Sequence, residues 1–136
     1  MTAEQIKKRD WLRRAKAINM YMEALEKQNQ KDKRLAKYLS EMDEPNEELN
    51  EKIKNFVSIQ QKKIKELLNI REEIQDAIFQ VCDDVLGTIL TRHYLLYETI
   101  EAIAEEMHYD KRTIQRKHKQ ALDKIVLHKV KGESAE

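Results

Sequence analysis

The chain has 136 residues, with 26 Lys and Arg, 25 Asp and Glu, 2 Gly, 1 Pro and 1 Cys. This length fits one domain, or one domain with an extension. Gly and Pro are too scarce to turn a sheet of short strands, which excludes an all-β fold. Ala, Glu, Lys, Leu and Arg make up just under half of the chain, a composition typical of long helices.

Composition also indicates the compartment. The single Cys82 cannot build a disulfide framework, and we expect it to be a small buried side chain near the end of a helix. No apolar region of the signal-peptide type follows the first residues, and no apolar stretch approaches the ~18 residues of a membrane span. We therefore expect a cytoplasmic, all-α protein with no membrane partner.

The first predicted helix carries a heptad seam. Apolar residues recur at alternating steps of four and three, at Trp11, Ala15, Ile18, Met22 and Leu25. The polar run 26–34 interrupts this seam, and an apolar stripe resumes from Leu35 through Leu39 to Met42. The pattern allows one long helix with a polar interruption, or two helices with a short break.

Pro45 marks the break before a second long helix, predicted over about 46–83, and suits its first turn. Steps of three or four connect its seam: Ile53, Val57, Gln60, Ile64, Leu67, Arg71, Ile74, Ile78 and Val81. Two such helices make an antiparallel, coiled-coil-like hairpin over residues 1–83. The hairpin can pair with itself, or two hairpins can form a four-helix dimer interface. Gln60 and Arg71 either fix the register or lie at the edge of the seam.

Three shorter helices follow. Asp83 and Asp84 can cap a helix over about 85–96, and Thr99 can cap a helix over about 100–107. Asp110 can cap the final helix. Tyr109 and Ile114 have the spacing of a hydrophobic staple around that cap.

The final helix is basic on one side. Residues 98–109 carry four Glu and no Lys or Arg, whereas residues 110–131 carry eight Lys and Arg against two Asp. At 100° per residue, Ile114, Ala121 and Ile125 share one face, with His118 beside them as a partly buried packing residue. Four polar side chains point the opposite way: Arg112, Gln115, Arg116 and Lys119. This layout predicts a helix-turn-helix that offers its second helix to the major groove.

The segment 86–125 resembles region 4 of bacterial sigma factors. The likeness lies in Arg92-His93-Tyr94-Leu95 and in Thr99-Ile100-Glu101-Ala102-Ile103-Ala104. The stretch Asp110-Lys111-Arg112-Thr113-Ile114-Gln115-Arg116 stands where that family has its recognition helix. The whole chain is similar to the sigma-region-4-like regulators of phages and prophages of Gram-positive bacteria, the ArpU- and RinA-like group. The resemblance implies transcription control, of phage late genes.

Two residues depart from the family pattern. His108 holds a turn position usually taken by Gly, so it must adopt a conformation costly for other residues or form a different turn. Lys117 replaces a residue that is often apolar, and can extend its amine from the core edge.

Each candidate DNA-binding residue has an expected role. Arg112, Gln115 and Arg116 would read bases, and Thr113 would touch the backbone or a thymine methyl. Phosphates would be neutralised by Lys111, Lys119 and Lys124, and the helix start at Thr99 could take a further phosphate. The basic residues of the first helix are expected to form a solvated face, with a second DNA contact as the alternative: Lys7, Lys8, Arg9, Arg13, Arg14 and Lys16.

The sequence therefore predicts a sequence-specific regulator that binds double-stranded DNA at the nucleoid, as a homodimer through the hairpin. The helix-turn-helix domain would span 84–128, and 129–136 would be a tail. The sequence contains neither a Gly-rich phosphate loop nor a nucleophile elbow, so we expect no enzyme, cofactor or metal site. Two alternatives stay open: a DNA-packaging component like a terminase small subunit, and an RNA polymerase-binding module that uses the acidic helix.

Overall fold

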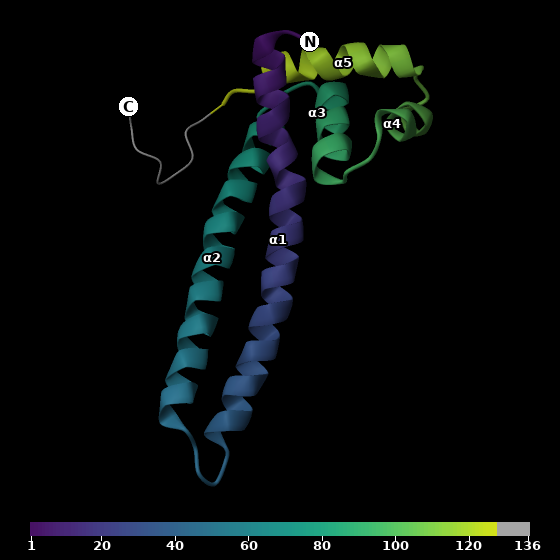
Figure 1. The fold of residues 1–136 in the computed structure, drawn as a ribbon. Helices are drawn as coiled ribbons and strands as arrows, with labels where there is room; N and C mark the ends of the chain where they lie inside the picture. The colour runs from purple at the N-terminus through teal and green to yellow at the C-terminus, as the bar shows by residue number, and fades with distance from the viewer. Residues whose placement is uncertain (128–136) are drawn as a thin grey trace, which may run out of the picture. The chain divides into compact units, whose positions relative to one another are not determined.

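A computed structural model describes residues 1–127, and within these residues every regular element is a helix and none is a strand. The elements are α1 (Ala3–Ser40), α2 (Glu47–Phe79), α3 (Asp84–Leu90), a π-helical turn η1 (Thr91–Leu95), α4 (Ile100–Met107) and α5 (Lys111–Lys124) (Figure 1). The predicted all-α class is confirmed for this part of the chain. The predicted tail, 129–136, lies outside the described residues.

The chain forms two compact units, which we describe separately. One comprises residues 18–69, and the other comprises residues 1–17 together with those from 70 onward. The predicted domain boundary after residue 83 stays a prediction. Among the described residues, no helix combines the length and the hydropathy that crossing a membrane requires.

α1 is one continuous helix, so the polar run 26–34 does not break it. Its start is a reciprocal capping box that the sequence analysis missed. The backbone N–H of Gln5 donates to Thr2 Oγ1 at 3.1 Å, and the backbone N–H of Thr2 donates to Gln5 Oε1 at 2.9 Å. A T-x-x-Q spacing is a local signal for this arrangement, and the helix begins at Ala3, eight residues before Trp11.

Residues 18–40 of α1 and 47–69 of α2 lie side by side, and we call them the helix pair (Figure 1). The heptad seam of α1 continues through the polar run without a change of phase, at Ile18, Met22, Leu25, Asn29, Asp32, Ala36 and Leu39. The interpretation of Leu35 and Met42 as part of the same stripe was wrong, because both side chains are exposed.

A hydrogen-bonded polar cluster occupies the middle of this seam. Asn29 and Gln60 are only 6% and 7% exposed. Asn29 Nδ2 donates to Gln60 Oε1 at 2.9 Å and to the carbonyl of Val57 at 3.1 Å, and Gln60 Nε2 donates to Asp32 Oδ2 at 2.7 Å. Gln60 therefore lies inside the seam, and its partners satisfy the polar atoms that burial removes from water.

Both ends of α2 differ from the prediction. Asn46 caps the helix, since its Oδ1 accepts from the N–H of Leu49 at 3.1 Å, and Pro45 precedes that cap instead of entering the first turn. The helix ends at Phe79 and not at about residue 83. Asp83 has an extended backbone and caps the next helix, since its Oδ1 accepts from the N–H of Leu86 at 2.9 Å. Cys82 falls in this extended segment and is exposed, so the prediction of a buried thiol was wrong.

The core of the other unit joins three short helices. Ile89 of α3, Ile103 and Ala104 of α4, and Ile114 of α5 are buried against one another. Figure 1 shows α3 running across α5, so a single apolar layer holds α5 against both preceding helices. Spacing predicted the place of Ile114 in this layer correctly.

The helix predicted over 85–96 changes character after Leu90. Its continuation is π-helical, with the N–H of Leu96 donating to the carbonyl of Thr91 at 3.0 Å. Such single turns insert one extra residue into a helix and are often found at functional sites. Here the π turn precedes Tyr97, which has a positive φ of 62°, and Tyr94 within it is buried.

The connection between α4 and α5 is three residues long. His108 adopts the left-handed conformation, with φ 61° and ψ 38°, as expected for a position that usually holds Gly. The N–H of Tyr109 donates to the carbonyl of Ala104 at 3.0 Å, which closes the helix end in the Schellman manner.

Replacing His108 by glycine should raise the free energy of unfolding by about 0.5–1 kcal/mol, because glycine has no Cβ to oppose a positive φ. Urea titration of His108→Gly against His108→Ala measures this effect. The alanine variant loses the same imidazole but keeps the Cβ, so it should not gain stability. Equal stability of the two variants would contradict the strain at this position.

Candidate nucleic-acid interface

α5 separates a buried face from a polar one. Its buried residues are Ile114, His118, Ala121 and Leu122. The four polar residues predicted to face outward are all exposed, Arg112, Gln115, Arg116 and Lys119, and so is Lys124. Thr113 is half-buried, and its backbone N–H donates to Asp110 Oδ1 at 2.7 Å, so the predicted cap is present.

Charges are organised at the start of α5. The hydrogen bond from the N–H of Thr113, followed by the nearby cations of Arg112 and Arg116, holds the pKa of Asp110 below its usual range. Lys111 Nζ lies 2.7 Å from Glu101 Oε1 of α4, and this contact lowers the pKa of Glu101. Lys111 is therefore half of an exposed ion pair that ties α4 to α5.

Lys117 and Tyr109 meet at the edge of the core. Lys117 is half-buried, and its Nζ lies 5.7 Å from the centroid of the Tyr109 ring. This is a cation–π distance, and it gives the amine a partner at the core edge.

The start of α1 packs along α5. Gln5 Nε2 donates to Asp123 Oδ1 at 3.0 Å and to the carbonyl of Lys119 at 3.3 Å. Lys8 Nζ donates to the carbonyl of Asp123 at 3.3 Å. A cleft of about 410 Å³ is formed here, and it is lined by Met1, Arg9, Arg13, His93, Ile100, Gln115, His118 and Lys119.

A second cleft, of about 340 Å³, continues this surface to the start of α4. It is lined by Arg13, Lys16, His93, Tyr94, Tyr97, Glu98 and Thr99. Thr99 Oγ1 accepts from the N–H of Ala102 at 3.1 Å, which confirms the predicted cap. Lys16 Nζ lies 5.8 Å from the centroid of the Tyr97 ring. Arg13 lines both clefts, so it connects Thr99 with Gln115 and Lys119.

The structure thus gathers most, but not all, of the predicted site. Thr99, Gln115 and Lys119 border the two clefts, and Arg112 and Arg116 lie on the adjoining exposed face. Lys124 is the last residue of the 14-residue α5, about 20 Å from Lys111 at ~1.5 Å per residue. Arg9 and Arg13 were expected on a solvated face, with a second DNA contact as the alternative. Arg9, Arg13 and Lys16 follow one another at steps of four and three residues. This spacing indicates that the three side chains lie on the same side of α1.

A buried aromatic pair supports α5 from behind. Tyr94 Oη and His118 Nε2 are 2.6 Å apart, and the His93 ring lies 5.2 Å from the His118 ring. Burial, then the nearby charges of His93, Arg13, Arg9 and Lys119, lowers the pKa of His118 to about 4. Burial raises the pKa of Tyr94. Both side chains are therefore neutral at pH 7, and the expected packing role of His118 is confirmed.

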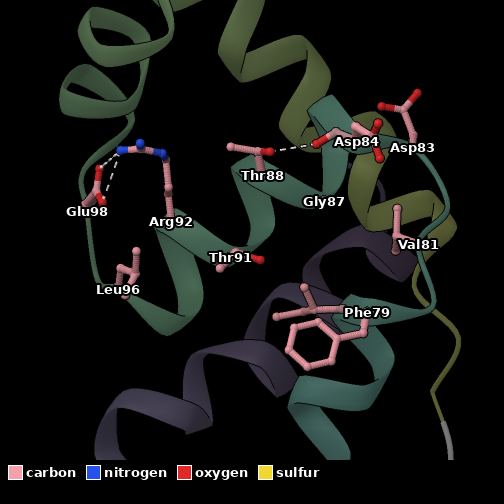
Figure 2. Close-up of a pocket in the computed structure, with 11 residues that line it drawn as sticks. Phe79, Val81, Asp83, Asp84, Gly87, Thr88, Thr91, Arg92, Leu96 and Glu98 are labelled. Atoms are coloured by element: carbon pink, nitrogen blue, oxygen red, sulfur yellow. Dashed lines mark hydrogen bonds and ion pairs between the residues drawn. The ribbon is translucent and has the colours of Figure 1, made fainter.

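A third groove, of about 690 Å³, has a different character (Figure 2). Phe79 and Leu96 give it apolar walls, while Asp83 and Asp84 lie on its rim. Figure 2 shows Arg92 paired with Glu98, their Nη1 and Oε1 atoms 3.0 Å apart. No predicted DNA-binding residue lines this groove. Its acidic rim does not suit a polyanion, which leaves the α5 side as the candidate interface.

Comparison of the chain with protein-family models, with curated proteins and with solved structures gave no match. The resemblance to sigma region 4 therefore stays an interpretation of the residues. Within residues 1–127, no three His, Cys, Asp or Glu side chains are grouped as metal ligands would be.

Proposed function

We propose that the protein is a sequence-specific transcription regulator of the phage and prophage type that binds double-stranded DNA. In this proposal α4 and α5 act as a helix-turn-helix like that of sigma region 4, with α5 in the major groove. One observation carries it: Arg112, Gln115, Arg116 and Lys119 are exposed together on α5, opposite the buried Ile114.

The side chains divide by role. Arg112 and Arg116 have the planar donor fork that pairs with guanine, and Gln115 has the amide that pairs with adenine. Lys119 and Lys124 supply charge for phosphates, while Thr113 is placed for the backbone or a thymine methyl. Lys111 would exchange its ion pair with Glu101 for a phosphate, a small cost because exposed pairs are weak. The exposed start of α4 at Thr99 suits a further phosphate.

Arg9 and Arg13 extend this interface. They line the same cleft as Gln115 and Lys119, so a duplex seated on α5 passes within reach of both guanidinium groups. Arginines on a flanking element carry no base information but add charge neutralisation. The proximity favours a second DNA contact over a purely solvated face for these two residues.

The test is a titration of the full chain into duplex fragments from around its own gene, at several salt concentrations. Tight binding to one fragment, with log K falling steeply against log salt, is expected. Arg112→Ala/Arg116→Ala should remove the preference between fragments and cost at least about tenfold in affinity. Arg9→Ala/Arg13→Ala should weaken all fragments alike and make the salt slope shallower by about 1–2.

The matched control is Lys7→Ala/Arg14→Ala, which removes the same charge from the other side of α1 and should bind as the wild type. Weak binding to every fragment that ignores the Arg112→Ala/Arg116→Ala change would reject DNA recognition by α5. In that case the alternative to test is that the protein binds RNA polymerase through its acidic helix. A ring of many subunits bound to DNA would instead favour a packaging component.

A further inference from the structure

The helix pair carries a second heptad stripe on the outside of each helix. On α1 the stripe runs through Tyr21, Ala24, Gln28, Lys31, Leu35 and Tyr38. On α2 it runs through Leu49, Lys52, Phe56, Ile59, Lys63 and Glu66. The steps alternate between three and four, as in the buried seam. Such spacing holds a stripe on one side of a helix.

Both stripes lie on the same side of the helix pair. Each stripe is about 100° from the buried seam of its own helix, and the offset has the same sense in both helices. Because the two helices run in opposite directions, equal offsets place the stripes side by side. We call this surface the outer face.

The outer face is apolar and exposed. Tyr38, Ile59 and Phe56 are 65%, 64% and 55% exposed, and Tyr21, Leu35 and Leu49 are also exposed. The opposite side of the helix pair is polar, at Glu23, Glu26, Gln30, Lys33, Lys37, Glu51, Lys54, Ser58, Gln61 and Lys65. Leu68 is the large apolar exception there among residues 18–69.

The outer face is large enough for a protein interface. Its six large apolar side chains, each at least 40% exposed, present on the order of 600 Å² of accessible surface. This is the upper end of the range for the largest apolar patch on a typical monomer, about 300–600 Å², and it approaches the ~800 Å² that one partner buries in a standard interface. Patches of that size often mark interaction surfaces.

We propose that the outer face binds the outer face of a second copy of this chain, which gives a four-helix interface with a two-fold axis parallel to the helices. The lysines of the stripes favour this arrangement. The hydrogen bond between Asn29 and Gln60 shows which residues share a level along the helix pair. Because the two helices are antiparallel, counting away from this pair in opposite directions along α1 and α2 gives the other levels. Lys31 lies level with Phe56 and Ile59, and Lys52 lies level with Tyr38.

With a parallel axis, α1 of one copy lies across α2 of the other at the same levels. Each lysine stem then packs over apolar or aromatic groups of the second copy: Lys31 over Phe56 and Ile59, and Lys52 beside Tyr38. A perpendicular axis places α1 across α1, and an axis at the level of Lys31 brings Lys31 against its own copy and Lys52 against Lys63. Like charges in contact disfavour that register.

The first test is the oligomeric state of the full chain by sedimentation equilibrium, without DNA, so the result does not depend on the proposed function. Wild type should be a dimer at micromolar concentration, and Phe56→Glu/Ile59→Glu should weaken the dimer at least about tenfold, ~1.4 kcal/mol. Both positions are exposed, so helicity by circular dichroism should be unchanged. Leu68→Glu, on the other side of α2, should dimerise as the wild type does.

The second test fixes the axis by disulfide trapping in a Cys82→Ser background. A mixture of Lys31→Cys and Ile59→Cys chains should give the mixed covalent dimer, and Lys31→Cys alone should give little. Self-linking of Lys31→Cys would overturn the parallel axis. A wild-type monomer, a ring of many subunits, or a dimer broken by Leu68→Glu and not by Phe56→Glu/Ile59→Glu would overturn the outer face as the interface.

Discussion

Gln60→Ala is expected to lower the free energy of unfolding of the helix pair by about 2–4 kcal/mol. The variant removes the acceptor of Asn29 and the donor to Asp32 at a position only 7% exposed. The buried amide of Asn29 then keeps one protein partner, the carbonyl of Val57, instead of two. The lost glutamine side chain also leaves a cavity. Urea unfolding followed by circular dichroism measures the difference against wild type.

The neighbouring Gln61→Ala is the matched control, because Gln61 is exposed, and should change stability by less than about 0.5 kcal/mol. A loss of that size for Gln60→Ala as well would mean that the cluster contributes nothing. Asn29→Leu/Gln60→Leu tests what the cluster is for. Paired apolar replacements of buried polar groups are often neutral or stabilising, so this variant should keep most of the stability.

The polar cluster also shows where sequence reasoning reached its limit. Spacing located the seam, since Asn29 and Asp32 keep the phase set by Ile18 and Met22. Hydrophobicity alone suggested an interruption, because Asn29 and Gln60 are 31 residues apart and only their pairing makes burial acceptable. Leu35 was assigned to the wrong stripe for the related reason that two apolar stripes share α1, whereas Met42 lies beyond the end of that helix.

Features that depend on neighbouring residues were predictable. Asp83, Thr99 and Asp110 each accept from a backbone N–H three residues ahead, and the sequence spacing that indicates such caps is local. The π turn after Leu90 has no sequence signature that distinguishes it from an α-helical continuation. The contact of Gln5 with Asp123 spans 118 residues, so the approach of Arg9 and Arg13 to Gln115 could not be derived from periodicity.

Acid should destabilise the fold through His118 in a defined range. Its pKa is about 4 in the folded protein and 6.5 without burial, so the unfolded chain binds a proton first as the pH falls. Above pH 6.5 the imidazole is neutral in both states and has no effect. Between pH 6.5 and about 4 the free energy of unfolding should fall, by at most ~1.4 kcal/mol per pH unit and up to ~3 kcal/mol in total.

The comparison of wild type with His118→Gln isolates this term. Glutamine can keep a hydrogen bond to Tyr94 Oη but does not titrate, so its stability should fall less steeply over the same range. Glu101 and Asp110, whose pKa values are lowered, lose their own contribution at lower pH in both proteins, and subtracting the two curves removes it. Identical slopes would mean that the imidazole is solvated when folded. A steeper acid loss in wild type would instead show that the neutral imidazole, buried against Tyr94, contributes to the stability of the fold at neutral pH.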